Sequence, residues 1–395
     1  MKKNIKCKIF KNICFTSHPK GCFKSVESQI QYIKDQGKFD GPKNVLILGS
    51  STGYGLASRI VSVFANNAHT IGVAYEKPGT DDEIGTAGWY NTQAFEKLAT
   101  ESNLKHHSIN GDAFSNEVKQ QVVKYTKENN IKLDLIVYSL AAPKRTDPKT
   151  GNTHNSVIKT IGKPFTYKTI DIKTEKLYEA SVEPATQQEI DDTIKVMGGE
   201  DWELWIELLK QENVLDNNVK TVAYSYIGPE FTKAIYRNGT LGKAKEHLEQ
   251  TVPKINNLLK PLNGHAYVSI NKALITKASA VIPAVPLYIC ILYKIMKNKN
   301  IHENCIHQIY RLFTQYIYKN EGDILLDDLG RIRIDDLELR EDVQSEVSEL
   351  FYKANSENLQ NISDLAGFKE AFMQFHGFMQ VGVNYQEQIE LSDWK

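Results

Sequence analysis

The stretch NVLILGSSTGYGLASRI, residues 44–60, decides the fold. It begins with a continuous apolar run, as expected for a strand that is buried on both faces. Gly49, Gly53 and Gly55 follow at the spacing G-x-x-x-G-x-G, and a helical pattern comes next. Glycines let a backbone turn tightly and approach a pyrophosphate, whose charge then lies at a helix N-terminus. In this strand–loop–helix context the stretch predicts dinucleotide binding rather than a bare structural turn.

Apolar runs and helical patterns alternate from this stretch onward. The expected strands are residues 44–49, 70–75, 107–110, 133–140, 221–227 and 266–270, and helices are expected at 54–66 and 115–129. Strands that alternate with helices form right-handed βαβ units and a parallel sheet. The predicted fold class is therefore α/β: a Rossmann-type doubly wound parallel sheet, similar to that of short-chain dehydrogenases.

We expect residues 1–395 to form a single large domain that is built of successive segments. The segments are an N-terminal hairpin and helix (1–43), a dinucleotide-binding half (44–143), inserted loops and helices that form a lid or substrate region (144–218), a catalytic half (219–277) and substrate-pocket and C-terminal helices (278–395). The hairpin is expected to turn at His18 and Pro19. Trp202 and Trp205 in the insertion are assigned to plain packing, with a lid role as the alternative.

Composition excludes several classes of protein. The chain has 395 residues, a formal net charge of zero and 41% hydrophobic residues, which is ordinary for a soluble globular protein. Balanced charge argues against nucleic-acid binding, which needs an excess of Lys and Arg. The longest apolar run, 278–293, contains Pro283 and Pro286 and is shorter than the roughly 20 residues that a bilayer requires. We therefore expect no membrane span.

The cysteines indicate a reducing compartment. Five cysteines in a chain of this length are too few for a disulfide framework, and the number is odd. We therefore expect a cytoplasmic protein. Cys14, His18 and Cys22 lie four residues apart, but this spacing matches no strong zinc pattern and no fourth ligand is evident. We predict no metal site, and no motif in the sequence suggests a flavin.

Residues that follow the other strands extend the predicted dinucleotide site. Tyr75 and Glu76 end the second strand, and an acidic residue there can accept hydrogen bonds from ribose hydroxyls. Because the same carboxylate would repel a 2′-phosphate, Glu76 favours NADH over NADPH; the alternative is a solvated charge at a strand end. The pairs 112–113 and 140–141 follow the third and fourth strands, where ligands bind in open α/β sheets.

The fifth strand ends near Tyr226, and Tyr236 is followed at nine positions by Lys245. At about 100° per residue, nine positions would place the two side chains on opposite faces of one helix. The turn signal at 238–239 and a predicted N-cap at Thr240 remove this difficulty. Tyr236 would then lie in a loop and Lys245 on the following helix, so that the two side chains can converge.

Motifs throughout the chain together resemble the trans-2-enoyl-CoA reductases and the closely related FabV-type enoyl-acyl-carrier-protein reductases. The motifs are HPKGC (18–22), GSSTGYG (49–55), YEKPGT (75–80), GDAF (111–114), SLAAPKR (139–145), Tyr-x8-Lys (236–245), ALITK (273–277) and FHGFMQVGVNY (375–385). The resemblance spans essentially the whole chain.

The resemblance implies an enzyme that reduces the double bond of a trans-2-enoyl thioester with NADH. Hydride goes to the β-carbon and a proton to the α-carbon. By this resemblance Tyr236 is the catalytic proton donor, Tyr226 binds the substrate at its thioester carbonyl, and Lys245 holds the nicotinamide ribose. We also expect the Lys245 charge to lower the pKa of Tyr236. The implied cofactor residues are Gly49, Ser50, Ser51, Thr52, Gly53, Tyr54, Tyr75, Glu76, Asp112, Ala113, Leu140, Ala141, Lys245, Leu274, Ile275 and Thr276.

Several alternatives stay open at this stage. A carbonyl reductase of ordinary short-chain type would need Tyr-x-x-x-Lys, which is absent at the corresponding place. A non-catalytic dinucleotide sensor would not need the Tyr236 and Lys245 pair. The substrate thioester can be carried by CoA or by acyl carrier protein, whose acidic surface would require a basic rim. The candidates for such a rim are Lys144, Arg145, Lys149 and Lys159. We expect a monomer, with the run at 278–293 lining the acyl pocket or packing as a core helix.

Overall fold

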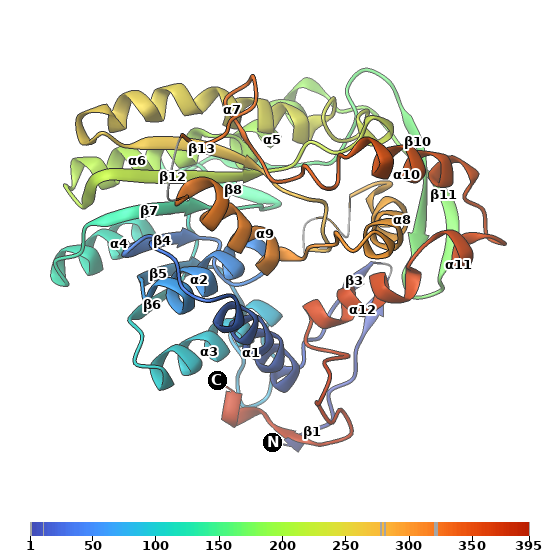
Figure 1. Ribbon diagram of the computed structural model, residues 1–395, viewed down its shortest axis with the longest axis horizontal. Helices are drawn as coiled ribbons and strands as arrows, with labels where there is room; N and C mark the ends of the chain where they lie inside the picture. Colours follow the sequence, from blue (N-terminus) through green and yellow to red (C-terminus); the bar gives the residue numbers. More distant parts are fainter. Residues whose placement is uncertain (1, 11, 277–278, 280–281, 320–322, 395) are drawn as a thin grey trace.

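The structure, a computed structural model, describes residues 2–10, 12–276, 279, 282–319 and 323–394. Within these ranges seven strands form a parallel sheet in the order β14-β13-β12-β7-β4-β5-β6 (Figure 1). Their bounds are β4 (Asn44–Leu48), β5 (His69–Ala74), β6 (His106–Asn110), β7 (Leu133–Tyr138), β12 (Leu215–Ser225), β13 (His265–Ile270) and β14 (Ile332–Arg333). The expected doubly wound α/β fold is confirmed, and the strand order reverses between β4 and β7.

Helices cover both faces of the sheet (Figure 1). One face carries α1 (Pro19–Gln36), α2 (Gly53–Asn66), α3 (Ala87–Glu101) and α9 (Cys305–Leu312), which continues into a π-helical turn, η4 (Phe313–Ile317). The other face carries α4 (Asn116–Glu128), α6 (Glu200–Gln211) and α7 (Thr240–Leu259), which ends in the turn η2 (Lys260–Leu262). The sheet is therefore the central layer of three.

Alternation along β4 explains its continuous apolar run. Val45 and Ile47 belong to the core cluster with α1, α2 and α3, whereas Leu46 and Leu48 belong to the cluster with α4, α6 and α7. All four side chains are fully buried. Burying a side chain of this size contributes about 1.5–3 kcal/mol, so both faces of β4 favour apolar residues.

The expected strands are all present, with ends that move by a few residues. β7 ends at Tyr138 rather than at residue 140, and β12 begins at Leu215, earlier than expected. β14 was not expected, because a strand of two residues has no detectable sequence period. Ser115 caps α4 through its hydroxyl oxygen, which accepts from the Val118 amide at 3.2 Å.

The insertion between β7 and β12 contains more strand than expected. Two antiparallel hairpins precede the helices: β8 (Lys144–Thr146) with β9 (Thr153–Asn155), and β10 (Phe165–Asp171) with β11 (Lys176–Val182). The sequence predicts only loops and helices for 144–218. The hairpins escape sequence analysis because their strands are short or largely polar. α5 (Gln187–Met197) and α6 follow as the expected helices, and Trp202 and Trp205 are fully buried, so the packing assignment is confirmed.

The N-terminal hairpin turns earlier than expected. β2 (Ile9–Phe10) pairs with β3 (Ile13–Cys14), so its turn precedes Cys14. His18 instead caps α1, since its Nδ1 accepts from the Gly21 amide at 3.2 Å, and Pro19 takes the first helical position, where its fixed φ is suitable. β1 (Lys2–Lys3) pairs with β15 (Ile389–Glu390) and joins the two ends of the chain (Figure 1).

The C-terminal part is built on α8 (Val285–Asn298). Its buried face packs with α10 (Glu341–Lys353) and α12 (Leu365–Phe375) in one cluster, which α11 (Leu359–Ile362) also joins. The chain ends in a short turn, η5 (Leu391–Trp394). Lys277 of the ALITK motif and residues 278 and 280–281 of the apolar run lie outside the described residues. No helix among the residues described is long and apolar enough to cross a membrane.

Candidate active site

The glycine loop after β4 fits closely against the end of β7. Gly49 has φ +89°, and a Cβ there would lie 2.2 Å from the Ser139 carbonyl oxygen. At Gly55 a Cβ would lie 1.9 Å from the Gly49 carbonyl oxygen. Neither position can hold a side chain, so the loop is compact and α2 begins directly at Gly53. Free amides at the start of this helix face the switch point of the sheet, where a phosphate can be bound.

Glu76 lies against the glycine loop. The Ser51 hydroxyl donates to Glu76 Oε1 at 2.7 Å. The Asn110 side chain bridges the ends of β5 and β6: its Oδ1 accepts from the Glu76 amide at 2.8 Å and its Nδ2 donates to the Glu76 carbonyl oxygen at 2.9 Å. A cavity of about 180 Å³ borders Glu76 and Asn110. This places the carboxylate where a ribose bound at the loop could reach it.

Other expected cofactor residues also converge on the loop. A Cβ at Gly49 would lie 3.2 Å from the Leu140 side chain, and one at Gly53 would lie 3.6 Å from the Thr276 methyl carbon. Ser279 supports the segment from Leu274 to Thr276, because its hydroxyl donates to the Leu274 carbonyl oxygen at 2.6 Å. Segments from three different strands therefore meet at the carboxyl edge of the sheet.

The remaining expected cofactor residues differ in how firmly they are held. The Ala113 carbonyl accepts from Lys119 Nζ at 3.1 Å and from Trp205 Nε1 at 3.1 Å, which fixes the backbone after β6. Asp112 Oδ1 accepts from the Phe114 amide at 2.9 Å. Tyr75 is 76% exposed, so the protein itself holds its side chain only weakly. Ala141 is also exposed.

Tyr226 and Tyr236 form a ring pair. Their centroids lie 4.9 Å apart and the planes meet at 76°, an edge-to-face contact. Tyr236 lies in the turn between η1 (Glu230–Thr232) and α7, as expected, and its amide donates to the Thr232 carbonyl oxygen at 3.0 Å. The turn and the end of β12 thus bring both phenols together.

The expected electrostatic effect on Tyr236 is wrong. Burial raises the pKa of the Tyr236 phenol, and this outweighs any influence of Lys245. A raised pKa is compatible with proton donation, since an enolate carbon binds a proton more strongly than a phenolate does. Lys245 Nζ donates instead to the Tyr224 carbonyl oxygen at 3.3 Å. Burial lowers the pKa of Lys245 to about 8, and nearby Glu249 opposes this shift.

The start of α7 also differs from the expectation. Gly239, not Thr240, is the N-cap residue of α7. The Thr240 hydroxyl donates to the Val157 carbonyl oxygen at 2.5 Å and accepts from the Lys159 amide at 3.2 Å. Thr240 therefore ties the first turn of α7 to the insertion. Lys245 lies in the second turn of this anchored helix.

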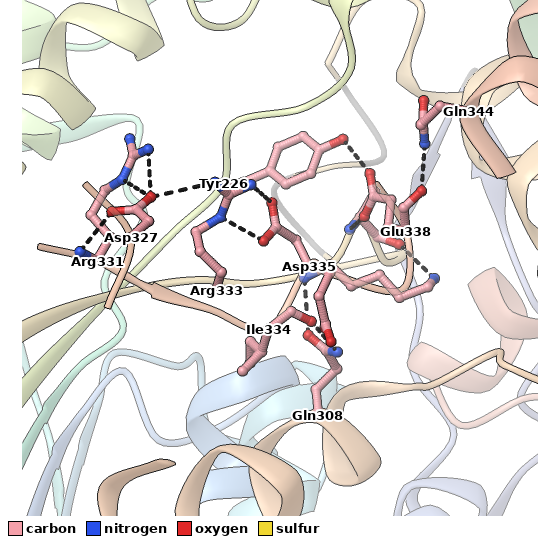
Figure 2. Close-up of polar contacts among 12 residues, drawn as sticks. Tyr226, Gln308, Asp327, Arg331, Arg333, Ile334, Asp335, Glu338 and Gln344 are labelled. Carbon is pink, nitrogen blue, oxygen red and sulfur yellow. Dashed lines mark hydrogen bonds and ion pairs between the residues drawn. The ribbon is translucent and has the colours of Figure 1, made fainter. Parts of the chain in front are cut away.

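The Tyr226 hydroxyl donates to Glu338 Oε1 at 3.0 Å (Figure 2). Glu338 was missed in the sequence, because the stretch RIRIDDLELR gives no sign of which acid is buried. Lys272, Ser139 and Asn110 were missed for the same reason: single polar residues beside a strand end have no period. Tyr54, by contrast, was expected at the site, and its hydroxyl donates to the Lys272 carbonyl oxygen at 2.8 Å.

Among the residues that the structure describes, no group of three or more His, Cys, Asp or Glu side chains is arranged to hold a metal ion. Cys14 lies beside Cys7, with Sγ atoms 3.5 Å apart, and Cys22 is buried in α1. The polar groups at the carboxyl edge of the sheet include backbone amides, hydroxyls, the Glu76 carboxylate and the Lys245 amine. Such a set suits a dinucleotide and a carbonyl compound.

A doubly wound sheet with a glycine loop at its switch point, and with a pair of tyrosines and Lys245 near the end of β12, defines a nicotinamide-dependent oxidoreductase. Two family models that match the chain identify the family within this class. "Trans-2-enoyl-CoA reductase catalytic region" matches residues 83–318, and "NAD(P)H binding domain of trans-2-enoyl-CoA reductase" matches residues 4–81. The chain belongs to the trans-2-enoyl-CoA reductase family.

Individual relatives agree with this placement. The chain is 53% identical over 380 residues to a protein of Clostridium perfringens strain SM101 named trans-2-enoyl-CoA reductase [NADH], with 96% of this chain and 97% of that protein covered. It is 53% identical over 374 residues to a protein of Flavobacterium johnsoniae named enoyl-[acyl-carrier-protein] reductase [NADH], with 95% and 94% covered.

Solved structures of the family have the same fold. The Clostridium acetobutulicum trans-2-enoyl-CoA reductase in complex with NADH superposes with a TM-score of 0.97, at 49% identity and 99% coverage of both chains. The Treponema denticola enzyme in complex with NAD gives a TM-score of 0.95, at 50% identity and 98% coverage of both chains. The recognition of the family and of its nicotinamide cofactor from sequence is confirmed.

A third model, described as "Enoyl reductase FAD binding domain", matches residues 326–389. The residues described there do not fit a flavin. Val343 and Phe351 of α10 and Phe368 of α12 are packed against α8 in the apolar core. A Cβ at Gly377 would lie 2.4 Å from the His18 carbonyl oxygen, so this glycine is closed off by protein rather than open to a pyrophosphate.

Proposed function

We propose that this chain reduces the carbon–carbon double bond of trans-2-enoyl thioesters to saturated acyl thioesters with NADH as the reductant. One observation carries the proposal: the phenols of Tyr226 and Tyr236 are in edge-to-face contact just after β12, and half-buried Lys245 donates to the Tyr224 carbonyl oxygen near the end of the same strand. Nicotinamide chemistry needs only a hydride acceptor and a proton donor in such a site. Bound NADH would supply the hydride that reaches the β-carbon.

The side chains of the site have separate roles in the reaction and in cofactor binding. Tyr226 hydrogen-bonds to the thioester carbonyl oxygen, which carries the negative charge of the enolate after hydride transfer. Tyr236 gives its proton to the α-carbon. Lys245 binds the nicotinamide ribose, and its half-buried position strengthens this contact, because part of the surrounding water is excluded. The glycine loop and Glu76 hold the pyrophosphate and the adenosine ribose.

The test uses the purified chain with NADH and crotonyl-CoA. Loss of NADH absorbance that depends on both the thioester and the protein, with butyryl-CoA as the product by mass spectrometry, is expected. A short-chain carbonyl compound such as acetoacetyl-CoA is the matched control, and it should give little turnover. Reduction of the carbonyl compound without reduction of crotonyl-CoA would contradict the proposal.

We propose CoA rather than acyl carrier protein as the main thioester carrier, although one relative is named for the carrier-protein reaction. An acidic carrier protein would need free cations at the rim. Arg145 is buried and paired with Glu200 at 2.8 Å, and Lys159 is paired with Glu189 at 2.6 Å. This pairing weakens the expected basic rim, of which Lys144 and Lys149 stay exposed. Comparing kcat/KM for crotonyl-CoA and a crotonyl-carrier protein decides between the two.

We further propose a cytoplasmic monomer in which segment 144–218 closes over the bound substrate. The sparse, odd set of five cysteines supports the reducing compartment. The Lys159 amide donates to the Thr240 hydroxyl, which connects the insertion to α7. Movement of the insertion would therefore shift α7 and the Lys245 side chain on it. Light scattering tests the monomer. Protection of 144–168 from hydrogen exchange by NADH with butyryl-CoA tests the closure.

A further inference from the structure

Glu338 is a buried acid behind the proposed substrate tyrosine. It lies between β14 and α10 and is fully shielded from solvent. Its carboxyl group accepts from the Tyr226 hydroxyl, more than a hundred residues away in the chain, and its backbone carbonyl oxygen accepts from Gln344 Nε2 at 2.7 Å (Figure 2). A buried carboxyl group is costly unless hydrogen bonds satisfy it, so the surrounding donors define what state it can adopt.

Three donors reach the two carboxyl oxygens. The Tyr226 hydroxyl donates to Oε1 at 3.0 Å, and the Tyr288 hydroxyl donates to the same oxygen at 2.6 Å. The Ala273 amide donates to Oε2 at 2.6 Å. Ala273 begins the segment that reaches Thr276, so Glu338 also connects the substrate tyrosine to the expected cofactor residues.

Proton counting limits what Tyr226 can do in this arrangement. A phenol has one proton. While that proton points at Glu338, the Tyr226 oxygen offers only lone pairs to a ligand, and lone pairs would repel the negative oxygen of an enolate. Tyr226 can stabilise this oxygen only when Glu338 no longer takes its proton.

If Glu338 is protonated, the Tyr226 hydroxyl proton no longer has to point at it. Oε2 already accepts from the Ala273 amide, so a proton on the carboxyl group is best placed on Oε1. The Tyr288 oxygen accepts from Gln344 Nε2 at 3.1 Å, which partly satisfies it. Tyr226 is then the better acceptor for the Glu338 proton, and its own hydroxyl proton becomes free to point at a ligand.

The surroundings of Glu338 make a protonated form accessible. Burial raises the pKa of the Glu338 carboxyl group, whereas the nearby Lys272 ammonium opposes this shift. Burial also lowers the pKa of Lys272 to about 8, so Lys272 loses its positive charge as the pH rises through about 8. The ionisable groups that influence or are influenced by Glu338 are Tyr226 after β12, Lys272 after β13, Asp335 after β14, Tyr288 in α8 and Tyr54 in α2.

We propose that Glu338 is a positioning residue that directs the proton of Tyr226. In its protonated form it donates to the Tyr226 oxygen and turns the Tyr226 hydroxyl toward the thioester carbonyl; in its ionised form it keeps the Tyr226 proton for itself. No covalent bond is made, and the proton on Glu338 comes from water. This proposal rests on the proposed function, because it assumes that Tyr226 contacts the thioester.

The test compares pH profiles of kcat at saturating NADH and crotonyl-CoA for wild type and Glu338→Gln. A glutamine at this position must accept from Ala273 through its oxygen, so its NH₂ group donates to the phenols at every pH. Wild-type kcat should fall by up to about 10-fold per pH unit as Glu338 ionises, and Glu338→Gln should lack this fall. The ratio of the variant's kcat to that of wild type should therefore rise with pH. Any ionisation of Lys245 affects both proteins and cancels in the ratio.

Two further variants separate this role from a structural one. In a Tyr226→Phe background the same ratio should not change with pH. Tyr288→Phe removes one donor from the carboxylate, so the fall of kcat should move to higher pH. Thermal midpoints and NADH affinities of all variants serve as folding controls. A ratio that is constant with pH, or one that rises equally without the Tyr226 hydroxyl, would overturn the proposal.

An infrared measurement does not depend on turnover. The wild-type minus Glu338→Gln difference spectrum should contain the carbonyl stretch of a protonated carboxyl group, which disappears as pH rises. Tyr226→Phe should shift this titration to higher pH, because the carboxylate loses a donor. If wild type reduces crotonyl-CoA but the band is absent at every pH, the Glu338 proposal alone fails. If the band titrates but no thioester is reduced, the proposed function fails instead and, with it, the assignment of the Tyr226 proton to a thioester.

Discussion

Glu76 should determine the choice of nicotinamide cofactor, and Glu76→Gln should weaken that choice. The carboxylate accepts from Ser51 in the glycine loop at 2.7 Å and is half-buried. A ribose 2′-phosphate bound there would lie roughly 5 Å from it. With an effective dielectric constant of about 20 to 60, one pair of negative charges at this distance costs about 1–3 kcal/mol. This corresponds to roughly a 5- to 150-fold preference for NADH over NADPH.

The assay measures kcat/KM for NADH and NADPH oxidation with crotonyl-CoA at low and high salt. Glu76→Gln should shift the NADH/NADPH ratio toward NADPH by about this factor, and salt should reduce the wild-type preference by screening. Asp82→Asn removes the same charge from the exposed loop that follows, and it should change the ratio less than about two-fold. Equal specificity constants for both cofactors in wild type would refute the reasoning.

Further outcomes concern Lys245, the cysteines and a buried ion pair. Because burial lowers the pKa of Lys245 to about 8, its charge is present below that pH and lost above it, so NADH affinity measured by fluorescence should fall as pH rises through about 8. Lys245→Met should remove this dependence and lower both affinity and kcat. Thiol alkylation should leave most activity intact, and zinc that is lost together with activity on Cys14→Ala would contradict this. Lys119→Met leaves Asp201 buried without its partner at 2.7 Å, and should cost about 3–5 kcal/mol of unfolding free energy in urea.

The sequence predicts those parts of the fold that follow a regular pattern, namely the buried parallel strands and the glycine loop. Buried parallel strands such as β4 need apolar residues on both faces, and a glycine loop must follow where the backbone of β7 approaches. These demands are local and leave a visible pattern. β14 and the hairpin of β10 and β11 have no such pattern, since their strands are short or half-solvated and their pairing depends on contacts made after folding.

In the candidate site, too, some residues could be predicted from a sequence pattern and others could not. Tyr226 and Tyr236 could be placed near each other, because strand ends and turn signals are visible in sequence. Glu338 could not be found, since its role depends on a segment more than a hundred residues away in the chain folding over Tyr226. The pKa of Tyr236 was expected to fall but is raised, because burial depends on the complete packing around the ring.

Steady-state kinetics of Tyr236→Phe tests the central claim most directly. The variant keeps the ring and its edge contact with Tyr226 but has no proton to give. We predict that kcat on crotonyl-CoA falls by roughly 10²–10⁴-fold, while NADH affinity by fluorescence titration hardly changes. Tyr226→Phe, measured alongside, should lower kcat and also weaken the apparent affinity for the thioester. A Tyr236→Phe enzyme with kcat close to wild type would contradict the assignment and make Tyr226 the proton donor.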